Sequence, residues 1–256
     1  MLIWPLQMNF RVRWHQPIER TESLPQLAFA WTLSTLLVVT ILPAQSPVPV
    51  YREPRHRLVW EGGPIRVLDV QIAPGDTTQF HVHDAPFLAV RVAVSATDVQ
   101  VLGEAWSGVG PKDRTHFYPG AIDPDTTYAV RSLTHRVTNA GTTNYRLIGV
   151  LNSGHGIVAG LPTVRLDLPG ITEHFSSWFQ ASRLTVPIGA RGRWFVAPVA
   201  VVIVQPGAGR TRIDRTIGAS TRLDGAASWV VLPAGTHFRV RNDGSVAGEL
   251  VFVGVR

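Results

Sequence analysis

The stretch PGDTTQFHVHDAPFLAV, from Pro74 to Val90, places two histidines one residue apart between a turn and an apolar run. In a β-strand, residues i and i+2 project from the same face. His81 and His83 therefore present two imidazoles side by side, with Gln79 on that face as well. If the face looks into a barrel, the imidazoles converge on one point that suits a Zn, Fe, Ni, Cu or Mn ion. A third ligand has to come from another strand.

Short alternating runs rich in Val, Ile and Leu surround this stretch and indicate an all-β chain. They are separated by turn sequences such as EGGP, APGD, DAP and NAGTTN. No convincing helical period of 3.6 residues runs through the chain after residue 44. The sequence predicts strands at IRVLDVQI (65–72), TQFHVH (78–83), FLAVRVAV (87–94), YAVRSLTHRV (128–137) and NYRLIGVL (144–151).

The chain also contains an internal echo. THRVTNAGTTNYRLIGV, from Thr134 to Val150, returns as THFRVRNDGSVAGELVFVGV, from Thr236 to Val255. A looser counterpart of residues 66–86 is found at residues 182–198. A repeat separation of about a hundred residues favours duplication of one domain over a solenoid, whose repeats are about 20 to 50 residues long. We predict one domain over residues 45–151, a linker over 152–162 and a second domain over 163–256.

These motifs resemble the cupin superfamily. Its first motif combines a glycine, a short run, His-x-His and then a carboxylate, and here Gly75 is followed by five residues and His81-Val82-His83. Its second motif pairs a histidine with an asparagine, which is similar to His135 and Asn139. The resemblance implies two tandem antiparallel β-barrels of the jelly-roll or double-stranded β-helix type, a bicupin with a degenerate C-terminal copy. It also implies that His81, His83 and His135 are the metal ligands.

One departure concerns the carboxylate of the first motif. Phe87 and Leu88 stand where the family has its glutamate, and Asp84 points to the opposite face unless the strand is bulged. The remaining set of three histidines resembles the thiol dioxygenase branch of the cupins. We therefore expect a divalent metal ion, with Fe(II) favoured and Zn, Ni, Mn or Cu as alternatives.

The second copy has no His-x-His. Arg193, Trp194 and Val196 fall where those ligands are expected, which leaves His237 alone, and we expect it to be a hydrogen-bonded core residue. His116, between the two motifs, is either a fourth ligand, a partner of a ligand, or a solvated loop residue.

The first 44 residues differ in composition from the rest. Residues 27–42, LAFAWTLSTLLVVTIL, are uncharged, follow three arginines and precede small residues, which is typical of a signal peptide or an N-terminal anchor. We expect a hydrophobic helix here and a secreted or periplasmic protein, anchored to the membrane only if the segment stays uncut. Its removal takes away three arginines and two glutamates, so the net charge changes from +6 to +5.

Composition restricts the partners and the chemistry. There are no cysteines, so any metal is held by nitrogen and oxygen. Of the 24 basic residues only Lys112 is lysine, and the arginines form no run, so nucleic-acid binding is not expected. Arg91 and Arg131 lie near the two motifs and are candidates, with Gln79, for contacts with a small-molecule substrate. Pairing of barrels through sheet edges makes a homodimer a further possibility.

Three functions fit this sequence. The first is an exported metal-binding cupin, for which the resemblance implies an oxidoreductase of the non-haem iron dioxygenase kind. The second is a non-catalytic module of the cell envelope that binds or senses a small molecule. Isomerase or lyase chemistry on a sugar or small acid is the third, because one fold hosts many activities.

Overall fold

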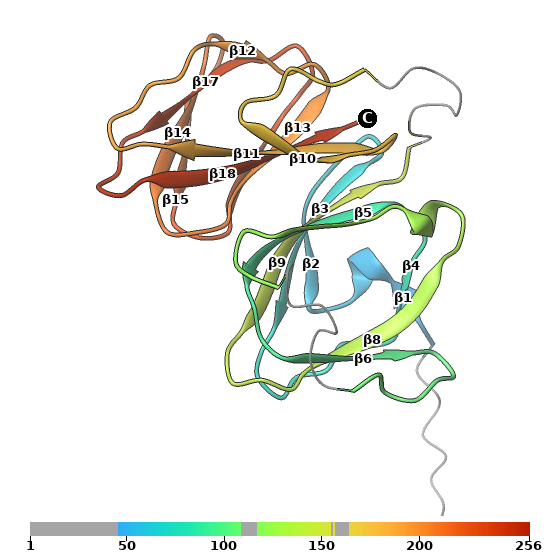
Figure 1. Cartoon of the computed structure of the whole chain (residues 1–256). Helices are drawn as coiled ribbons and strands as arrows, with labels where there is room; N and C mark the ends of the chain where they lie inside the picture. The colour runs from blue at the N-terminus through green and yellow to red at the C-terminus, as the bar shows by residue number, and fades with distance from the viewer. Residues whose placement is uncertain (1–45, 109–116, 155, 157–163) are drawn as a thin grey trace, which may run out of the picture. The chain divides into compact units, whose positions relative to one another are not determined.

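The computed structural model describes residues 46–108, 117–154, 156 and 164–256 and shows two antiparallel β-barrels (Figure 1). The expected N-terminal helix over residues 27–42 lies outside the described residues, and so do most of the expected linker and His116. Within the described ranges, no helix is long and apolar enough to cross a membrane.

The first barrel consists of two sheets with two single-turn 3-10 helices, η1 (Val50–Arg52) and η2 (Thr127–Ala129). One sheet has the order β1 (Val48–Pro49), β4 (His81–His83), β8 (Leu133–Asn139) and β6 (Thr97–Val101). The other has the order β2 (His56–Gly62), β3 (Ile65–Ile72), β9 (Tyr145–Asn152), β5 (Phe87–Ala93) and β7 (Ile122–Asp125). Neighbouring strands are antiparallel except β1 and β4, which are parallel.

The second barrel repeats this plan. One sheet has the order β12 (Phe195–Val196), β17 (His237–Asn242), β14 (Arg210–Arg215) and β15 (Thr221–Asp224). The other has the order β10 (Ile171–Phe175), β11 (Phe179–Val186), β18 (Gly248–Val255), β13 (Ala200–Gln205) and β16 (Ser228–Leu232). The five-stranded sheets correspond strand for strand, and the four-stranded sheets share three strands, with β12, β17 and β14 in the places of β4, β8 and β6.

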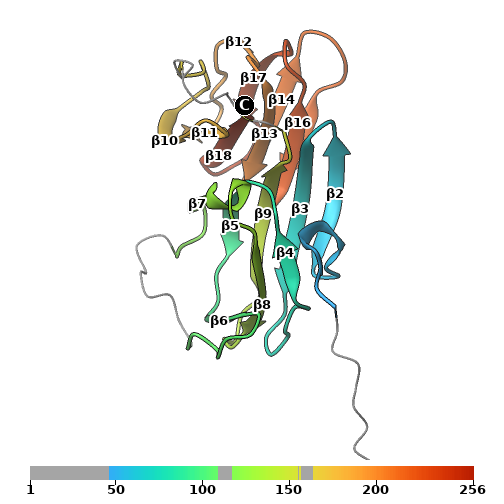
Figure 2. The same cartoon turned by 90° about the vertical axis from the view of Figure 1, so that its right-hand side faces the viewer.

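Strand β3 carries apolar side chains on both of its faces. Figure 2 shows β3 between β2 and β9. Leu68 and Val70 point into the first barrel, where they join its inner core. Ile65 and Val67 point the other way, into an apolar cluster that also contains residues of β11, β13 and β18. Both faces of the strand therefore carry buried apolar side chains, so its sequence does not alternate strictly between apolar and polar residues.

Two asparagines close matching turns in the two barrels. Asn139 is fully buried, donates to two backbone carbonyls at 2.8 Å each and accepts from a backbone N–H at 3.1 Å. Asn242 is also buried and makes the same three bonds at 2.8 Å each. The repeated sequence thus forms the same Asn-x-Gly turn after the strand in both barrels.

The strand bounds in the structure differ in two places from those predicted from the sequence. The run 78–83 contributes only His81–His83 to a strand, because the preceding residues form an isolated bridge and a loop. The run 128–137 is not one strand. It begins within the 3-10 turn η2, and only β8, from Leu133 onward, is extended.

Candidate metal centre

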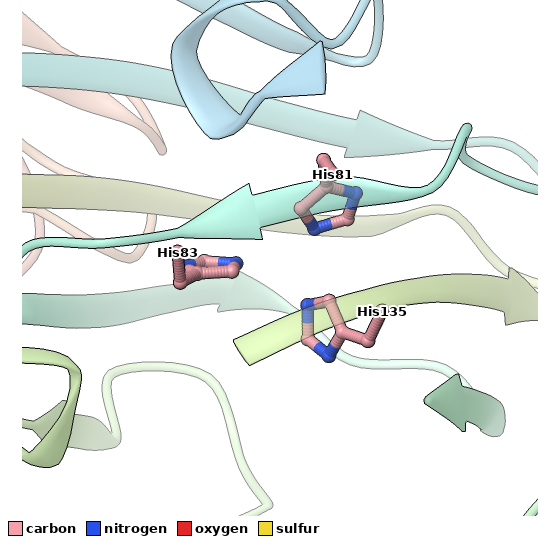
Figure 3. A group of neighbouring side chains, drawn as sticks. All are labelled: His81, His83 and His135. Carbon is pink, nitrogen blue, oxygen red and sulfur yellow. The ribbon is translucent and has the colours of Figure 1, made fainter. Parts of the chain in front are cut away.

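Three histidines on two adjacent strands meet inside the first barrel. His81 pairs directly with His135 across β4 and β8, and His83 follows two residues later on the same face as His81. Each offers one ring nitrogen, and these nitrogens all lie within 4.8 Å of one another. Figure 3 shows the three rings turned toward a common space. The geometry expected from i, i+2 spacing is therefore realised.

Hydrogen bonds to backbone set the orientation of His81. Its Nδ1 lies 2.9 Å from the carbonyl oxygen of Gln79, so Nδ1 is the donor and Nε2 carries a lone pair. The N–H of Gln79 is itself bonded to the buried carboxylate of Glu53 at 3.1 Å. His81 Nε2 and His83 Nδ1 are buried and have no hydrogen-bond partner in the described part of the chain.

The three imidazoles are neutral at ordinary pH. Burial lowers the pKa of His81 to about 4. Burial, with repulsion from His81, lowers the pKa of His135 to about 3. Burial and the neighbouring histidines hold the pKa of His83 well below its ordinary value. Unprotonated imidazole is the form that binds a metal ion, so no proton has to leave before coordination.

The histidines line a cavity of about 180 Å³. Its wall is largely apolar, with a polar region contributed by β7 and η2. The lining residues are His56, Val70, Ile72, His81, His83, Phe87, Ala89, Asp123, Asp125, Tyr128, His135, Val137, Tyr145 and Leu147. This volume admits a small molecule rather than a polymer.

Tyr128 joins the histidines to the acidic side of the cavity. Its ring centre lies 4.9 Å from that of His83. Burial raises the pKa of its phenol, and the carboxylate of Asp125, to which the phenol is hydrogen-bonded, raises it further. Tyr128 therefore stays protonated at neutral pH.

Arg91 and Tyr145 form a second polar pair at the cavity. Arg91 forms an ion pair with Asp123 and donates to the hydroxyl of Tyr145 at 2.7 Å. Burial raises the pKa of Tyr145, so this phenol also keeps its proton. Its oxygen already accepts from Arg91, which leaves its own O–H available to another acceptor.

Phe87 occupies the position at which a carboxylate was expected. Its ring packs against His83, with centres 5.3 Å apart, and lies over Gly149, where an added Cβ would come within 2.5 Å of it. Asp125 is paired with Phe87 across β5 and β7 and also lines the cavity. A carboxylate is thus present in this region, but the neighbouring strand provides it.

The remaining candidate residues lie in different surroundings. The backbone of Gln79 contacts His81 and Glu53, as described above, but its side chain does not line the cavity. Arg91 touches the cavity through Tyr145 and Asp123. Arg131 is exposed in the segment between η2 and β8. Asp84 is exposed as well and does not line the cavity.

The second barrel is filled with apolar side chains at the corresponding positions. Phe195 pairs with Phe238 across β12 and β17, as His81 pairs with His135. Phe238 also precedes Asn242 by four residues, the distance between His135 and Asn139. The inner apolar cluster of this barrel contains Phe238 and Phe195. It also contains Ala197, which follows Phe195 by two residues as His83 follows His81.

This register corrects the interpretation of the second copy. The aligned positions are Phe195, Ala197 and Phe238, whereas Arg193, Trp194 and Val196 are exposed. His237 corresponds to Thr134, the residue before His135. A shift of one residue moves a side chain to the other face of a strand, so His237 is exposed and is not a core residue.

Sequence reasoning did not identify His56, a fourth histidine that lines the cavity. It begins β2 and is 6% exposed. Its surroundings, YREPRHR, have no strand alternation, and only the pairing of His56 with Val70 of β3 shows which way it faces.

No protein-family model matches the sequence, and no curated protein matches it either. Among solved structures, AerE from Microcystis aeruginosa is similar with a TM-score of 0.57, covering 82% of this chain and 98% of that one at 11% identity. The chain therefore has a double cupin fold. At this identity, the likeness shows the fold alone.

Weaker similarity extends to two further solved structures. A cupin 2 conserved barrel domain protein from Leptotrichia buccalis has a TM-score of 0.47 at 9% identity, covering 78% of this chain and 87% of that one. Oxalate decarboxylase from Bacillus subtilis has a TM-score of 0.45 at 11% identity, covering 75% and 68%. The evidence for a three-histidine site in this bicupin therefore comes from the geometry of this chain alone.

Proposed function

We propose that this bicupin binds one divalent metal ion through His81, His83 and His135. One observation carries the proposal: three neutral imidazoles converge beside a cavity, and the buried Nε2 of His81 and Nδ1 of His83 have no hydrogen-bond donor among the described residues. Leaving such groups unpaired costs about 1 to 3 kcal/mol each. A metal ion accounts for these lone pairs. Neutral nitrogen ligands suit Fe(II), which we favour, and also Zn, Ni, Cu or Mn.

We further propose that the centre serves an oxidoreductase of the dioxygenase kind. With three protein ligands, a bound Fe(II) ion would leave positions at which substrate and dioxygen bind. The chain itself would position the substrate. Tyr145 can donate a hydrogen bond from its protonated phenol, because its oxygen only accepts from Arg91, and apolar side chains such as Phe87 exclude water. A small molecule with at least one acceptor oxygen fits this arrangement.

The first experiment measures the metal content of the purified protein by elemental mass spectrometry. We expect close to one ion per chain in the wild type and a large loss in His81→Ala and His135→Ala. His237→Ala is the matched control, because this histidine is exposed in the second barrel and should leave the metal content unchanged. Equal metal content in the wild type and both cavity variants would contradict the proposal.

A second experiment separates an enzyme from a binding module. Phe87 favours the non-catalytic alternative, because it places an apolar ring against His83 where a ligand carboxylate was expected. Dioxygen uptake by the Fe(II)-loaded protein is measured with small thiols and small carboxylic acids. Uptake that disappears in His135→Ala supports an oxidoreductase. Tight binding of a small molecule without any uptake supports the module.

We also propose that the protein is exported, since residues 27–42 and their flanks have the composition of a signal segment. Fusion of residues 1–44 to a reporter that is active only outside the cytoplasm tests this. Activity that depends on the apolar stretch supports export. A reporter that stays inactive contradicts it.

A further inference from the structure

His56 shares the cavity with the three histidines but belongs to the opposite sheet. It begins β2, it is 6% exposed, and its ring centre lies 4.4 Å from that of His81 at an interplanar angle of 78°. Because β2 pairs with β3 while His81 is on β4, the fold brings this fourth imidazole to the site from a separate part of the chain.

His56 and His81 each keep one ring nitrogen without a partner. Nδ1 of His56 and Nε2 of His81 are both buried and have no hydrogen-bond partner in the described ranges. The other nitrogen of His81 donates to the backbone carbonyl of Gln79. A buried imidazole nitrogen that no other group engages is available as a metal ligand.

The surroundings of His56 offer no other explanation for that lone pair. The neighbouring Arg55 directs its guanidinium to Asp76 and Glu53, away from the imidazole. No carboxylate belongs to the group of close donors found among the described residues, which consists of His81, His83 and His135. A fourth nitrogen would therefore complete a site that the first barrel builds from histidine alone.

We propose that His56 is a fourth ligand of the metal ion held by His81, His83 and His135. This inference rests on the proposed metal binding. The nitrogens that already lie within 4.8 Å of one another do not include one from His56, so its ring has to move toward the ion on binding. Four neutral imidazoles favour Zn(II), Cu(II), Ni(II) and Fe(II) over Mg(II) and Ca(II), which prefer oxygen ligands.

Zinc binding to the full chain provides the first test, by competition with a chromophoric chelator. We expect His56→Gln to weaken Zn(II) binding by about 10- to 100-fold, the range found even when an outer partner of a metal ligand is removed. His237→Gln is the matched control and should bind like the wild type. Far-UV circular dichroism and thermal unfolding of each variant show whether the barrels remain folded.

A second measurement counts the ligands directly. X-ray absorption of the Zn(II)-loaded wild type should show four imidazoles, and His56→Gln should show three. Three imidazoles in the wild type overturn the inference, even if His56→Gln binds zinc more weakly, because His56 would then act only through its neighbours. If His135→Ala loses zinc while His56→Gln stays within twofold of the wild type, the inference fails but the metal site stands. A wild type that binds no zinc contradicts both.

Discussion

Acidification should destabilise the metal-free protein, because its cavity buries histidines in neutral form. Burial lowers the pKa of His81 to about 4 and, with repulsion from His81, that of His135 to about 3. The unfolded chain takes up protons near the ordinary value of 6.5. Between about pH 6.5 and pH 4 the unfolded state therefore binds more protons than the folded state. Stability is expected to fall as the pH decreases through this window.

His81 sets the size of the effect. A pKa of about 4 in the folded state, against 6.5 in the unfolded state, corresponds to about 3 kcal/mol of unfolding free energy, at about 1.4 kcal/mol for each pH unit. The imidazoles repel one another when charged, so their contributions are not additive, but the total exceeds that of His81 alone. Asp69 and Asp214, whose pKa values are lowered from 3.8, take up protons below the window.

Urea unfolding of chelator-treated protein, followed by tryptophan fluorescence between pH 7.5 and pH 4, measures this loss. The control is the double variant His81→Phe, His135→Phe, which copies Phe195 and Phe238 of the second barrel and should remove the part of the pH dependence that these two histidines contribute, while the buried His56 and His83 keep theirs. A wild-type stability that varies by less than about 1 kcal/mol over this range, far below the linkage expected for buried histidines, would refute the reasoning. So would a double variant that keeps the full dependence.

Three further sets of substitutions test the barrel fold and the proposed metal site. Asn139→Ala and Asn242→Ala should each lower the unfolding free energy by about 3 kcal/mol, at about 1 kcal/mol for each lost hydrogen bond, and unequal losses in urea unfolding would contradict the equivalence of the two turns. Phe87→Glu should strengthen Zn(II) binding at least about tenfold in chelator competition, because a carboxylate favours a divalent ion, and unchanged affinity would show that position 87 does not face the ion. Gly170→Ala should lower the melting temperature far more than Gly189→Ala. Both glycines have positive φ, but only a Cβ at position 170 would collide with a backbone oxygen, that of Arg183. Similar losses in the two variants would contradict this clash.

The sequence contained most of what positions the three histidines. The spacing of His81 and His83 places both on one face of a strand, and the second motif adds His135 from another strand. The central strands were recognisable because they are buried on both sides. The run 128–137 was read as one strand because its apolar residues alternate locally, whereas local hydrogen bonds from Thr127 to Asp125 begin a 3-10 turn at Tyr128.

The interior of the second barrel was harder to predict. Aligning Thr-His with Thr-His equates His237 with His135, but the Arg-Val-x-Asn-x-Gly part of the same echo equates Phe238 with it. The second alignment is correct, because Asn139 and Asn242 make the same bonds. The asparagine was the better guide, since a turn constrains the backbone more strictly than a surface histidine does. His56 gave no periodic signal, because its position depends on pairing between β2 and β3.

The two barrels together show that the histidines are not required by the fold. The second barrel has an equivalent five-stranded sheet, three equivalent strands in its four-stranded sheet and the same asparagine turn, yet it fills the corresponding positions with Phe195, Ala197 and Phe238. Apolar side chains thus fill these interior positions of the barrel without leaving any polar group unpaired there. The first barrel instead keeps unpartnered imidazole nitrogens in its interior, at a cost in stability that packing alone does not repay. The second barrel shows that the same fold is built more stably with apolar residues at these positions. The histidines of the first barrel are therefore best explained by a ligand that they bind.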